Sequence, residues 1–238
     1  MVRAVTHIHT RHSWDGIIKP RELVAKLKQR EVRLALVTDH DTFAGSQEVA
    51  AIARREYKNL MVPLAAEVRT DFGDVIVVLD GPSTPPIHAL KKWNTLVEVV
   101  RELRGLIWLP HPFRGHSDVR QIAPEADVIE VFNARCSNEE NDKAQILCEE
   151  VSAAAAYGSD AHLLREVDRV LVEYEPRPSP QETLKGSPEP ILLEQAKRSD
   201  RDRAEIVNGF KRRRIDLIGY FTARLMRDQV REWVGKVG

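Results

Sequence analysis

Cysteine is scarce in this chain, and neither sign of charge is in excess. The two cysteines among the 238 residues, Cys136 and Cys148, are too few for a disulfide framework, so we expect both to be reduced thiols. Lysine plus arginine and aspartate plus glutamate each number 36, so the net charge does not favour nucleic acid or an anionic membrane as a partner. Any affinity for anions must therefore come from a local group of side chains.

Long apolar runs are also missing. No stretch approaches the roughly 20 consecutive apolar residues of a membrane span. The N-terminus has no charged segment followed by the apolar core of a signal peptide. We therefore expect a cytoplasmic protein with no membrane contact. A hydrophobic content of 42% is enough for the core of one barrel-sized domain with an appendage.

Short apolar runs alternate with helix-like segments through about residue 175. Such alternation predicts an α/β fold with a parallel sheet, and seven runs predict a closed or nearly closed TIM-like barrel. One further run, 75–79, is expected to pair as a hairpin with the third strand. The seven strands are predicted at 2–6, 34–37, 61–65, 106–109, 128–132, 151–157 and 167–172, and helices from Pro20 and over 45–57, 93–103 and 138–151.

Metal-ligand residues follow five of these runs. His7 and His9 are two positions apart, which on a strand points both imidazoles to one side, and Asp160 and His162 repeat that spacing. Because the carboxyl ends of barrel strands meet at one rim, residues far apart in the sequence can share one pocket there. The other candidates at strand ends are His40, Glu67 and His111.

A divalent cation is the simplest partner for this set, because so many converging polar groups would be costly to bury without one. Mixed histidine and carboxylate ligands without a thiolate suit a catalytic rather than a structural site. The candidates exceed the needs of one ion, so we expect two or three ions of Zn, Mn or Fe, with Glu67 able to bridge two of them. A metal-bound water would then be the nucleophile at phosphorus.

Six segments of the chain contain the candidate ligands and their neighbours: His7-Ile8-His9, Asp15-Gly16, Thr38-Asp39-His40, Glu67, His111-Pro112 and Gly158-Ser159-Asp160-Ala161-His162. In this order, over about residues 2–175, they resemble the motifs of the PHP (polymerase and histidinol phosphatase) family. The resemblance implies a metal-dependent phosphoesterase on a distorted seven-stranded (β/α)7 barrel, with a domain at 1–175. It also implies a first ion held by His7, His9, Glu67 and Asp160, and a second held by Asp15, His40 and His162.

The family's third ion uses Glu67 and His111 with one more histidine, which usually stands in a Gly-x-x-His pattern after the glutamate. The matching stretch here is Gly73-Asp74-Val75-Ile76, and Ile76 cannot ligate a metal. His88 lies downstream, but we do not expect it to take the place of this histidine. A third site is therefore expected to be weak, empty or completed by water.

Three arginines follow the rim motifs. Guanidinium groups bind phosphate through paired hydrogen bonds, so at least one of Arg69, Arg114 and Arg135 is predicted to contact a substrate phosphate. Asn133 is predicted either to hydrogen-bond the substrate or to cap a helix.

Three further residues near the rim are candidates for supporting roles. Asp39 is predicted to orient a ligand histidine from behind. His12 and His116 are each either a proton donor to the leaving oxygen or an ordinary surface residue.

Residues 176–238 are predicted to form a Pro-punctuated link and a charged tail that is helical from about residue 191. This segment loosely resembles the short tail of many PHP proteins. It is expected to pack on the barrel or on a partner subunit, which leaves a homodimer open, and its basic run 211–214 is expected to be a solvated helix surface. Its apolar face would comprise Leu192, Leu193, Ile206, Phe210, Leu217, Ile218, Phe221, Leu225 and Trp233.

Three functions compete. The first is a metal-dependent phosphoesterase acting on a small-molecule phosphate ester or a nucleotide, with a nucleic-acid end also open. The second is an amidohydrolase-type C–N hydrolase, a class that commonly bridges its ions with a modified lysine after the fourth strand. Here that strand is followed by Pro110-His111, which disfavours this hypothesis. The third is a non-catalytic PHP-like binding module, which should have lost ligands that this chain retains.

Overall fold

The computed structural model describes residues 1–81 and 83–237, with side chains described as far as residue 231, so the predicted apolar contact of Trp233 lies outside the described residues. The strands are β1 (Val2–Ile8), β2 (Leu34–Val37), β3 (Leu64–Arg69), β4 (Asp74–Leu79), β5 (Leu106–Leu109), β6 (Val128–Asn133), β7 (Ala154–Gly158), β8 (Val170–Tyr174) and β9 (Glu189–Leu193). The helices are α1 (Pro20–Gln29), α2 (Ala44–Glu56), α3 (Trp93–Glu102), α4 (Val119–Ile122), α5 (Asn138–Val151), α6 (Pro180–Leu184), α7 (Arg198–Lys211) and α8 (Ile215–Val237), with 3₁₀ turns η1 (Ile87–Lys91), η2 (Ala123–Glu125) and η3 (Leu164–Glu166).

Local sequence signals place several helix starts. Pro20 occupies the first turn of α1, where its missing N–H costs nothing. Ser137 caps α5: its hydroxyl accepts from the Glu140 N–H at 3.2 Å, and the Glu140 carboxylate accepts from the Ser137 N–H at 2.7 Å. These caps fix where the chain leaves the region that carries the candidate ligands.

The strands form two mixed sheets, ordered β2-β1-β8-β9 and β3-β4-β5-β6-β7. The pairs β1–β2, β5–β6 and β6–β7 are parallel. The pairs β3–β4, β4–β5, β1–β8 and β8–β9 are antiparallel. The β3–β4 hairpin confirms the expected pairing of the 75–79 run with the third strand.

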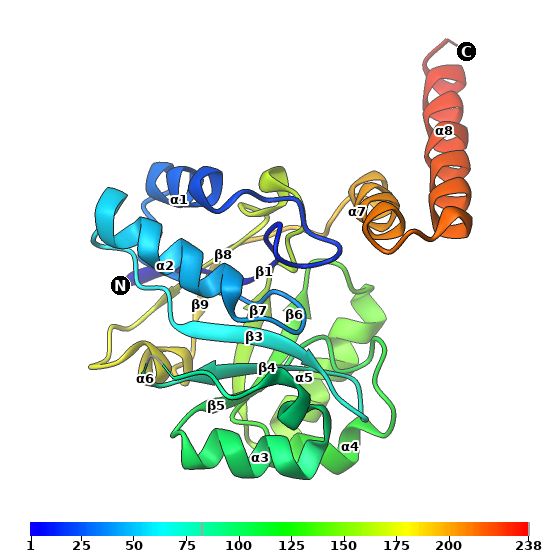
Figure 1. The fold of residues 1–238 in the computed structure, drawn as a ribbon. Helices are drawn as coiled ribbons and strands as arrows, with labels where there is room; N and C mark the ends of the chain where they lie inside the picture. Colours follow the sequence, from blue (N-terminus) through cyan, green and yellow to red (C-terminus); the bar gives the residue numbers. More distant parts are fainter. Residues whose placement is uncertain (82, 238) are drawn as a thin grey trace.

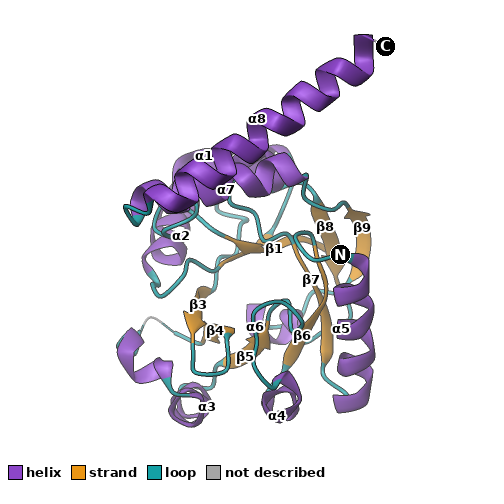
Figure 2. Cartoon of the chain, turned by 90° about the vertical axis from the view of Figure 1, so that its right-hand side faces the viewer, coloured by secondary structure: helices purple, strands orange, loops and turns teal. Residues whose placement is uncertain are grey.

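Isolated bridges connect the two sheets at both sides. The bridge between His40 and Glu67 joins the end of β2 to β3, and the bridge between Ile8 and Ala161 joins β1 to the segment after β7. Figure 2 shows the strands of both sheets around one central space, with helices outside them. A mixed α/β fold is therefore confirmed, whereas a single closed seven-stranded barrel is not, because neither sheet closes on itself.

Alternating strand residues build an inner and an outer core. Leu36, Ile76 and Trp108 belong to one buried cluster between the strands. Their neighbours on the same strands, such as Val77 and Ile107, pack outward in a cluster that includes residues of α3 and α5. Because side chains alternate along a strand, every second residue points inward, and these residues fill the middle of the strand ring below the ends that carry the candidate ligands.

The structure corrects several predicted boundaries. The seventh strand, β8, begins at Val170 and runs antiparallel to β1, because only the short turn η3 separates it from β7 and a parallel return needs a longer crossover. β3 begins at Leu64 and Glu67 lies inside it rather than at its end, while β7 begins at Ala154 because α5 continues to Val151. Leu192 and Leu193 belong to β9, which pairs with β8, and not to a helix.

The tail contacts the strand region through α7. Asp200 on α7 is buried and accepts from Arg165 Nε and Arg169 Nη2, each at 2.9 Å. Helix α8 packs on α7 and then projects away from the rest of the molecule (Figure 1). No helix in the described part of the chain is both long and apolar enough to cross a membrane.

Replacement of Asp200 by alanine should release α7. The change leaves Arg169, whose side chain is 11% exposed, without its carboxylate partner, and an unpaired buried charge is strongly destabilising. Hydrogen exchange should show α7 amides exchanging at least about 100-fold faster, with α5 amides unchanged. Asp216→Ala, which removes an exposed partner of Arg214, is the control, and equal α7 exchange in both variants would contradict this account of docking.

Candidate metal centre

Glu67 lies at the centre of the candidate site. Its Oε2 atom is 3.1 Å from His7 Nε2, 3.2 Å from His9 Nε2 and 3.5 Å from His40 Nδ1. Its Oε1 atom is 3.1 Å from His111 Nε2. The carboxylate is fully buried, and four imidazoles surround it.

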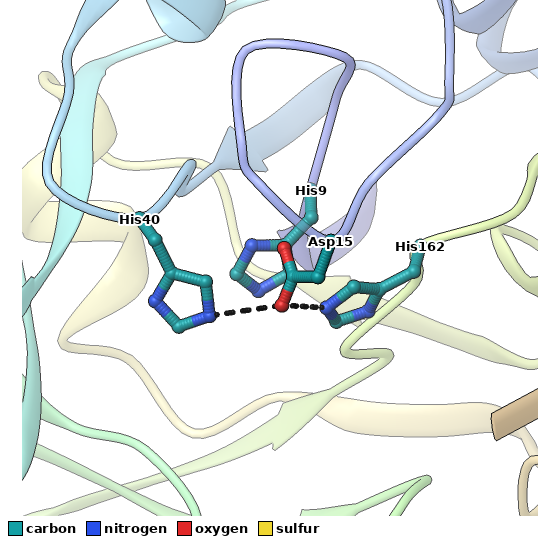
Figure 3. A group of neighbouring side chains, drawn as sticks. All are labelled: His9, Asp15, His40 and His162. Atoms are coloured by element: carbon teal, nitrogen blue, oxygen red, sulfur yellow. Dashed lines mark hydrogen bonds and ion pairs between the residues drawn. The ribbon is translucent and has the colours of Figure 1, made fainter. Parts of the chain in front are cut away.

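Asp15 organises a neighbouring group, shown in Figure 3. Its Oδ2 atom is 2.9 Å from His162 Nε2 and 3.3 Å from His40 Nε2. The ring of His9 stacks on that of His162 with centroids 4.2 Å apart. One ligand atom from each of these four residues lies within 4.8 Å of the others, which is close enough for a shared ion.

The structure brings all eight predicted ligands into such groups. Three of these groups are His9–Asp15–His40–His162, His7–His9–Glu67 and His7–His111–Asp160. The second set implied by the resemblance, Asp15, His40 and His162, lies in one group. The first set is divided between two groups that share His7, one with His9 and Glu67 and the other with Asp160.

A fourth group contains a residue that sequence reasoning missed. Asp74 lies with His40 and Glu67 within the same 4.8 Å limit. It sits on β4 two residues before Ile76, and Ile76 is buried in the inner core. His88 is exposed on η1 and does not line the pocket described below. Asp74 could have been found from the sequence, because it lies two positions before Ile76, where the family usually has a histidine, and a spacing of two on a strand places both side chains on one side.

Three ligand residues have left-handed backbone conformations. The φ angles are 60° at His7, 29° at His111 and 47° at Asp160, a region that costs non-glycine residues energy. Ser159 helps to hold two of these turns, because its hydroxyl lies 2.9 Å from the His7 carbonyl oxygen, to which it can donate. These turns direct side chains from strand ends into the centre.

Glu130 is a second residue that the sequence analysis did not single out. Its Oε1 atom accepts from His7 Nδ1 at 2.7 Å, and its Oε2 atom accepts from Asn133 Nδ2 at 2.9 Å. A Cβ added at Gly158 would collide with this carboxylate, so glycine is required there. Glu130 thereby turns His7 Nε2 toward Glu67. Its signal was a charged residue in the middle of an otherwise apolar strand.

The donor set fits a divalent cation. His9 Nε2 and His40 Nδ1 are buried, and although both lie near Glu67 Oε2, neither forms a hydrogen bond of acceptable geometry among the described residues. Burial and the neighbouring His162 lower the pKa of His9 to about 3, so its imidazole is neutral and has a lone pair to offer. Although burial alone would raise it, the pKa of Glu67 lies well below its usual value because of His40 and His7. Neutral imidazoles and ionised carboxylates are the forms that ligate metals.

His40 shows the opposite electrostatic effect. Burial alone would lower its pKa, but the carboxylates of Glu67 and Asp15 raise it to about 9. A proton on His40 therefore balances negative charge in the metal-free protein. A cation placed between the same carboxylates would take over that charge balance.

The predicted phosphate-binding residues lie in different settings. Arg114 Nη2 contacts Asp160 Oδ2, and Arg69 Nε lies 2.5 Å from Asp74 Oδ1 with its side chain 54% exposed. Both line the pocket over the ligands. Arg135 also lines the pocket, but its guanidinium donates to the Asp160 carbonyl at 2.7 Å and to a buried glutamate.

Asn133 and Asp39 are held inside the protein. The Asn133 side chain is fully buried and lines none of the described pockets. Its Nδ2 atom donates to Glu130, and its Oδ1 atom accepts from the Arg135 N–H at 2.9 Å. Asp39 accepts from the Thr10 N–H at 2.7 Å and the Thr10 hydroxyl at 2.8 Å. It thus fixes the residue after His9 rather than a ligand imidazole directly.

His12 and His116 do not line the pocket. His12 pairs with Glu48 at 2.5 Å on the surface, and His116 Nε2 donates to the Asp74 carbonyl at 2.7 Å. Neither contact directs an imidazole toward the ligand groups.

A pocket of about 600 Å³ opens over the ligands, and part of its wall comes from the tail. All four residues of the basic run 211–214 are exposed, as predicted, and Arg212 also lines this pocket together with Arg198 and Arg201 of α7. Trp14 lies at the same wall, stacked on His40 with ring centroids 4.1 Å apart. No lysine lines the described pocket.

Comparison with known sequences finds a family model described as PHP-associated at residues 138–187, from α5 to just past α6. Two curated relatives from Methanocaldococcus jannaschii also match. The uncharacterized protein MJ0417 is 35% identical over 127 residues, covering 49% of this chain and 52% of that protein. The uncharacterized protein MJ1587 is 28% identical over 147 residues, covering 56% of this chain and 82% of that protein. The chain thus spans about half the length of the first relative.

Three solved structures are similar in fold. A candidate metal-dependent phosphoesterase from Bifidobacterium adolescentis has a TM-score of 0.56 at 15% identity, covering 67% of this chain and 87% of that one. A two-domain protein from Bacteroides vulgatus contains a predicted PHP-like metal-dependent phosphoesterase. It has a TM-score of 0.62 at 13% identity, and the match covers 81% of this chain and 65% of that one. An amidohydrolase from Chromobacterium violaceum with bound sulfate has a TM-score of 0.54 at 17% identity, covering 84% and 96%.

At these identities the likeness to each solved structure shows a shared fold. The PHP-associated match covers residues 138–187 of this chain, and two of the three solved structures are described as metal-dependent phosphoesterases, one of them PHP-like. The clustered histidines and carboxylates in the described residues are suited to divalent metal ions.

Glu67→Gln should weaken metal binding while preserving side-chain size. The amide removes the negative charge that four imidazoles face, so affinity for Mn²⁺ should fall by at least about tenfold. Equilibrium dialysis with elemental analysis should give two or more ions per wild-type chain and fewer for the variant. Glu98→Gln, at an exposed position on α3, is the control. A wild-type chain that binds no metal would contradict the assignment of this centre.

Asp160 should make the metal-free protein sensitive to acid. Burial raises the pKa of this carboxyl, but Arg114, His7 and other cationic neighbours outweigh burial and hold it well below its usual range. Its contribution to stability is therefore present above about pH 4 and is lost as the pH falls through the folded-state pKa. The free energy of urea unfolding should drop between about pH 5 and pH 3, and drop less in Asp160→Asn. An equal drop in both proteins would exclude this role.

Proposed function

We propose that this chain is a metal-dependent phosphoesterase that hydrolyses a phosphate ester at a multinuclear site. The observation that carries the proposal is the buried Glu67 carboxylate among His7, His9, His40 and His111, next to the second group built on Asp15. The PHP-like neighbours support the same general kind of protein. A small-molecule phosphate ester or a nucleotide is the proposed substrate.

The proposed ligand roles follow from the groups described above. His7, His9, Glu67 and Asp160 would hold one ion, and Asp15, His40 and His162 a second, with Glu67 and His111 available to a third. Asp74, which lies with His40 and Glu67 within 4.8 Å, is a further carboxylate that could hold an ion beside Glu67. When bound, divalent ions supply charge neutralisation at the phosphate and lower the pKa of a water molecule.

The chain's own residues position the ester. Arg114 lies beside Asp160 at the pocket wall, where its guanidinium can bind the transferring phosphoryl group. Glu130 holds the Nδ1–H of His7, so that Nε2 keeps its lone pair toward the centre. In the reaction a water oxygen bonds to phosphorus, the bond from phosphorus to the ester oxygen breaks, and a proton moves to the leaving oxygen.

The two alternatives receive less support. One neighbour in fold is an amidohydrolase, which favours a C–N hydrolase. However, no lysine lines the described pocket, and β5 is followed by Pro110 and His111 where that class commonly has its bridging lysine. A non-catalytic binding module is disfavoured because all eight candidate ligands are present and grouped. Phosphate ester hydrolysis fits the arginines that line the pocket best.

Hydrolysis of 4-nitrophenyl phosphate with added Mn²⁺ tests the proposal. Wild type should release 4-nitrophenol, and Asp160→Ala should lower kcat/KM at least about 100-fold because it removes a metal ligand and the partner of Arg114. Glu98→Gln should match wild type. The aryl amide 4-nitroacetanilide, which presents a C–N bond, should not be cleaved; cleavage of the amide but not of the ester would favour the amidohydrolase alternative.

A further inference from the structure

One face of α7 is directed into the metal pocket. The residues that line the pocket from this segment are all polar. After Arg198, they follow three, seven, ten and fourteen positions later, which is a helical spacing. Because these spacings place side chains on one side of a helix, the pocket receives a continuous polar stripe from the tail. The stripe consists of Arg198, Arg201, Glu205, Asn208 and Arg212.

This stripe, the α7 face, carries three arginines, of which only Arg198 has a carboxylate oxygen within 4.0 Å among the described residues. Arg198 is 3.7 Å from Asp228 on α8. Arg201 Nη1 donates to the Arg135 carbonyl at 3.1 Å, and the Arg212 guanidinium lies 5.4 Å from the centre of the Trp14 ring. Within the described residues, neither Arg201 nor Arg212 has a carboxylate oxygen within 4.0 Å.

The positions of these two arginines are fixed relative to the metal ligands. Arg201 contacts the backbone of Arg135, whose own Nε atom donates to the Asp160 carbonyl at 2.7 Å. Arg212 lies over Trp14, which stacks on His40. The α7 face therefore borders both ligand groups.

Lys211 fastens the end of α7 to the loop that carries Asp15. Its Nζ atom donates to the carbonyl oxygens of Ser13 and Gly16, each at 2.6 Å, and to that of Arg11 at 3.2 Å. The ammonium group thus ties the helix to the same loop that positions a candidate metal ligand. This attachment keeps the α7 face over the centre.

We propose that the α7 face is a second anion subsite, so that the preferred substrate is a phosphate ester whose leaving group carries a further phosphate or carboxylate. The inference rests on the proposed function. The reacting phosphoryl group occupies the metal centre near Arg114, and Arg201 and Arg212 bind the second anion. Planar guanidinium groups match both kinds of anion through paired charge-assisted hydrogen bonds.

The experiment compares propyl phosphate with 1,3-propanediol bisphosphate, using Mn²⁺-supplemented full-length protein. Wild type should prefer the bisphosphate in kcat/KM by at least about tenfold, after correction for its two equivalent esters, because charged hydrogen bonds add this much. The Arg201→Gln/Arg212→Gln double variant should bring the ratio close to one. Arg227→Gln, at an exposed position on α8 outside the pocket lining, should keep the wild-type ratio.

A binding measurement separates this inference from the proposed function. Calorimetry should show that propane-1,3-diphosphonate binds wild type at least about tenfold more tightly than propylphosphonate, and that the double variant loses this difference. Because phosphonates need no turnover, this result stands even where neither ester is hydrolysed. Arg212→Gln alone, which replaces an exposed side chain, keeps the test available if the double variant fails to fold. An unchanged bisphosphate or diphosphonate preference in the variants, or none in wild type, overturns the subsite.

Discussion

The interaction on which the rest of the structure depends is that between the Glu67 carboxylate and the four imidazoles around it. A buried charge of this kind is tolerated only when its partners are held in place, because removing any one leaves the others unpaired. The partners come from β1 and from the segments that follow β1, β2 and β5. The ring of strands thus has to bring three distant stretches of chain to Glu67 on β3, and a cation fits the same arrangement that stabilises the acid.

A second layer of residues makes this convergence specific. Glu130 fixes the orientation of His7, and Gly158 leaves the space that the Glu130 carboxylate occupies. Thr10, held by Asp39, fixes the backbone beyond His9. The left-handed turns at His7, His111 and Asp160 then aim ligands from strand ends inward, at a cost in backbone energy that these surrounding contacts offset.

Much of the ligand set could be predicted from the sequence because most of its members follow short apolar runs. The His7-x-His9 and Asp160-x-His162 pairs were found because each follows an apolar run, but left-handed turns at His7 and Asp160, not the period of two in a strand, direct them inward. The α5 start follows from its capping residues. The antiparallel course of β8 depends on a short connection that the composition of the apolar run does not reveal. Asp74 and Glu130 were missed because their importance comes from partners on other strands. The α7 face looks like an ordinary solvated helix surface until its position over the pocket is known.

The metal donors and the α7 face are encoded in separate stretches of the chain, the donors up to His162 and the face from Arg198 onward. The proposed cleavage site and the proposed subsite for the leaving group would therefore depend on separate stretches of the chain. Substitutions along one stripe of a single helix would then change the preferred ester while every candidate donor atom stays in place.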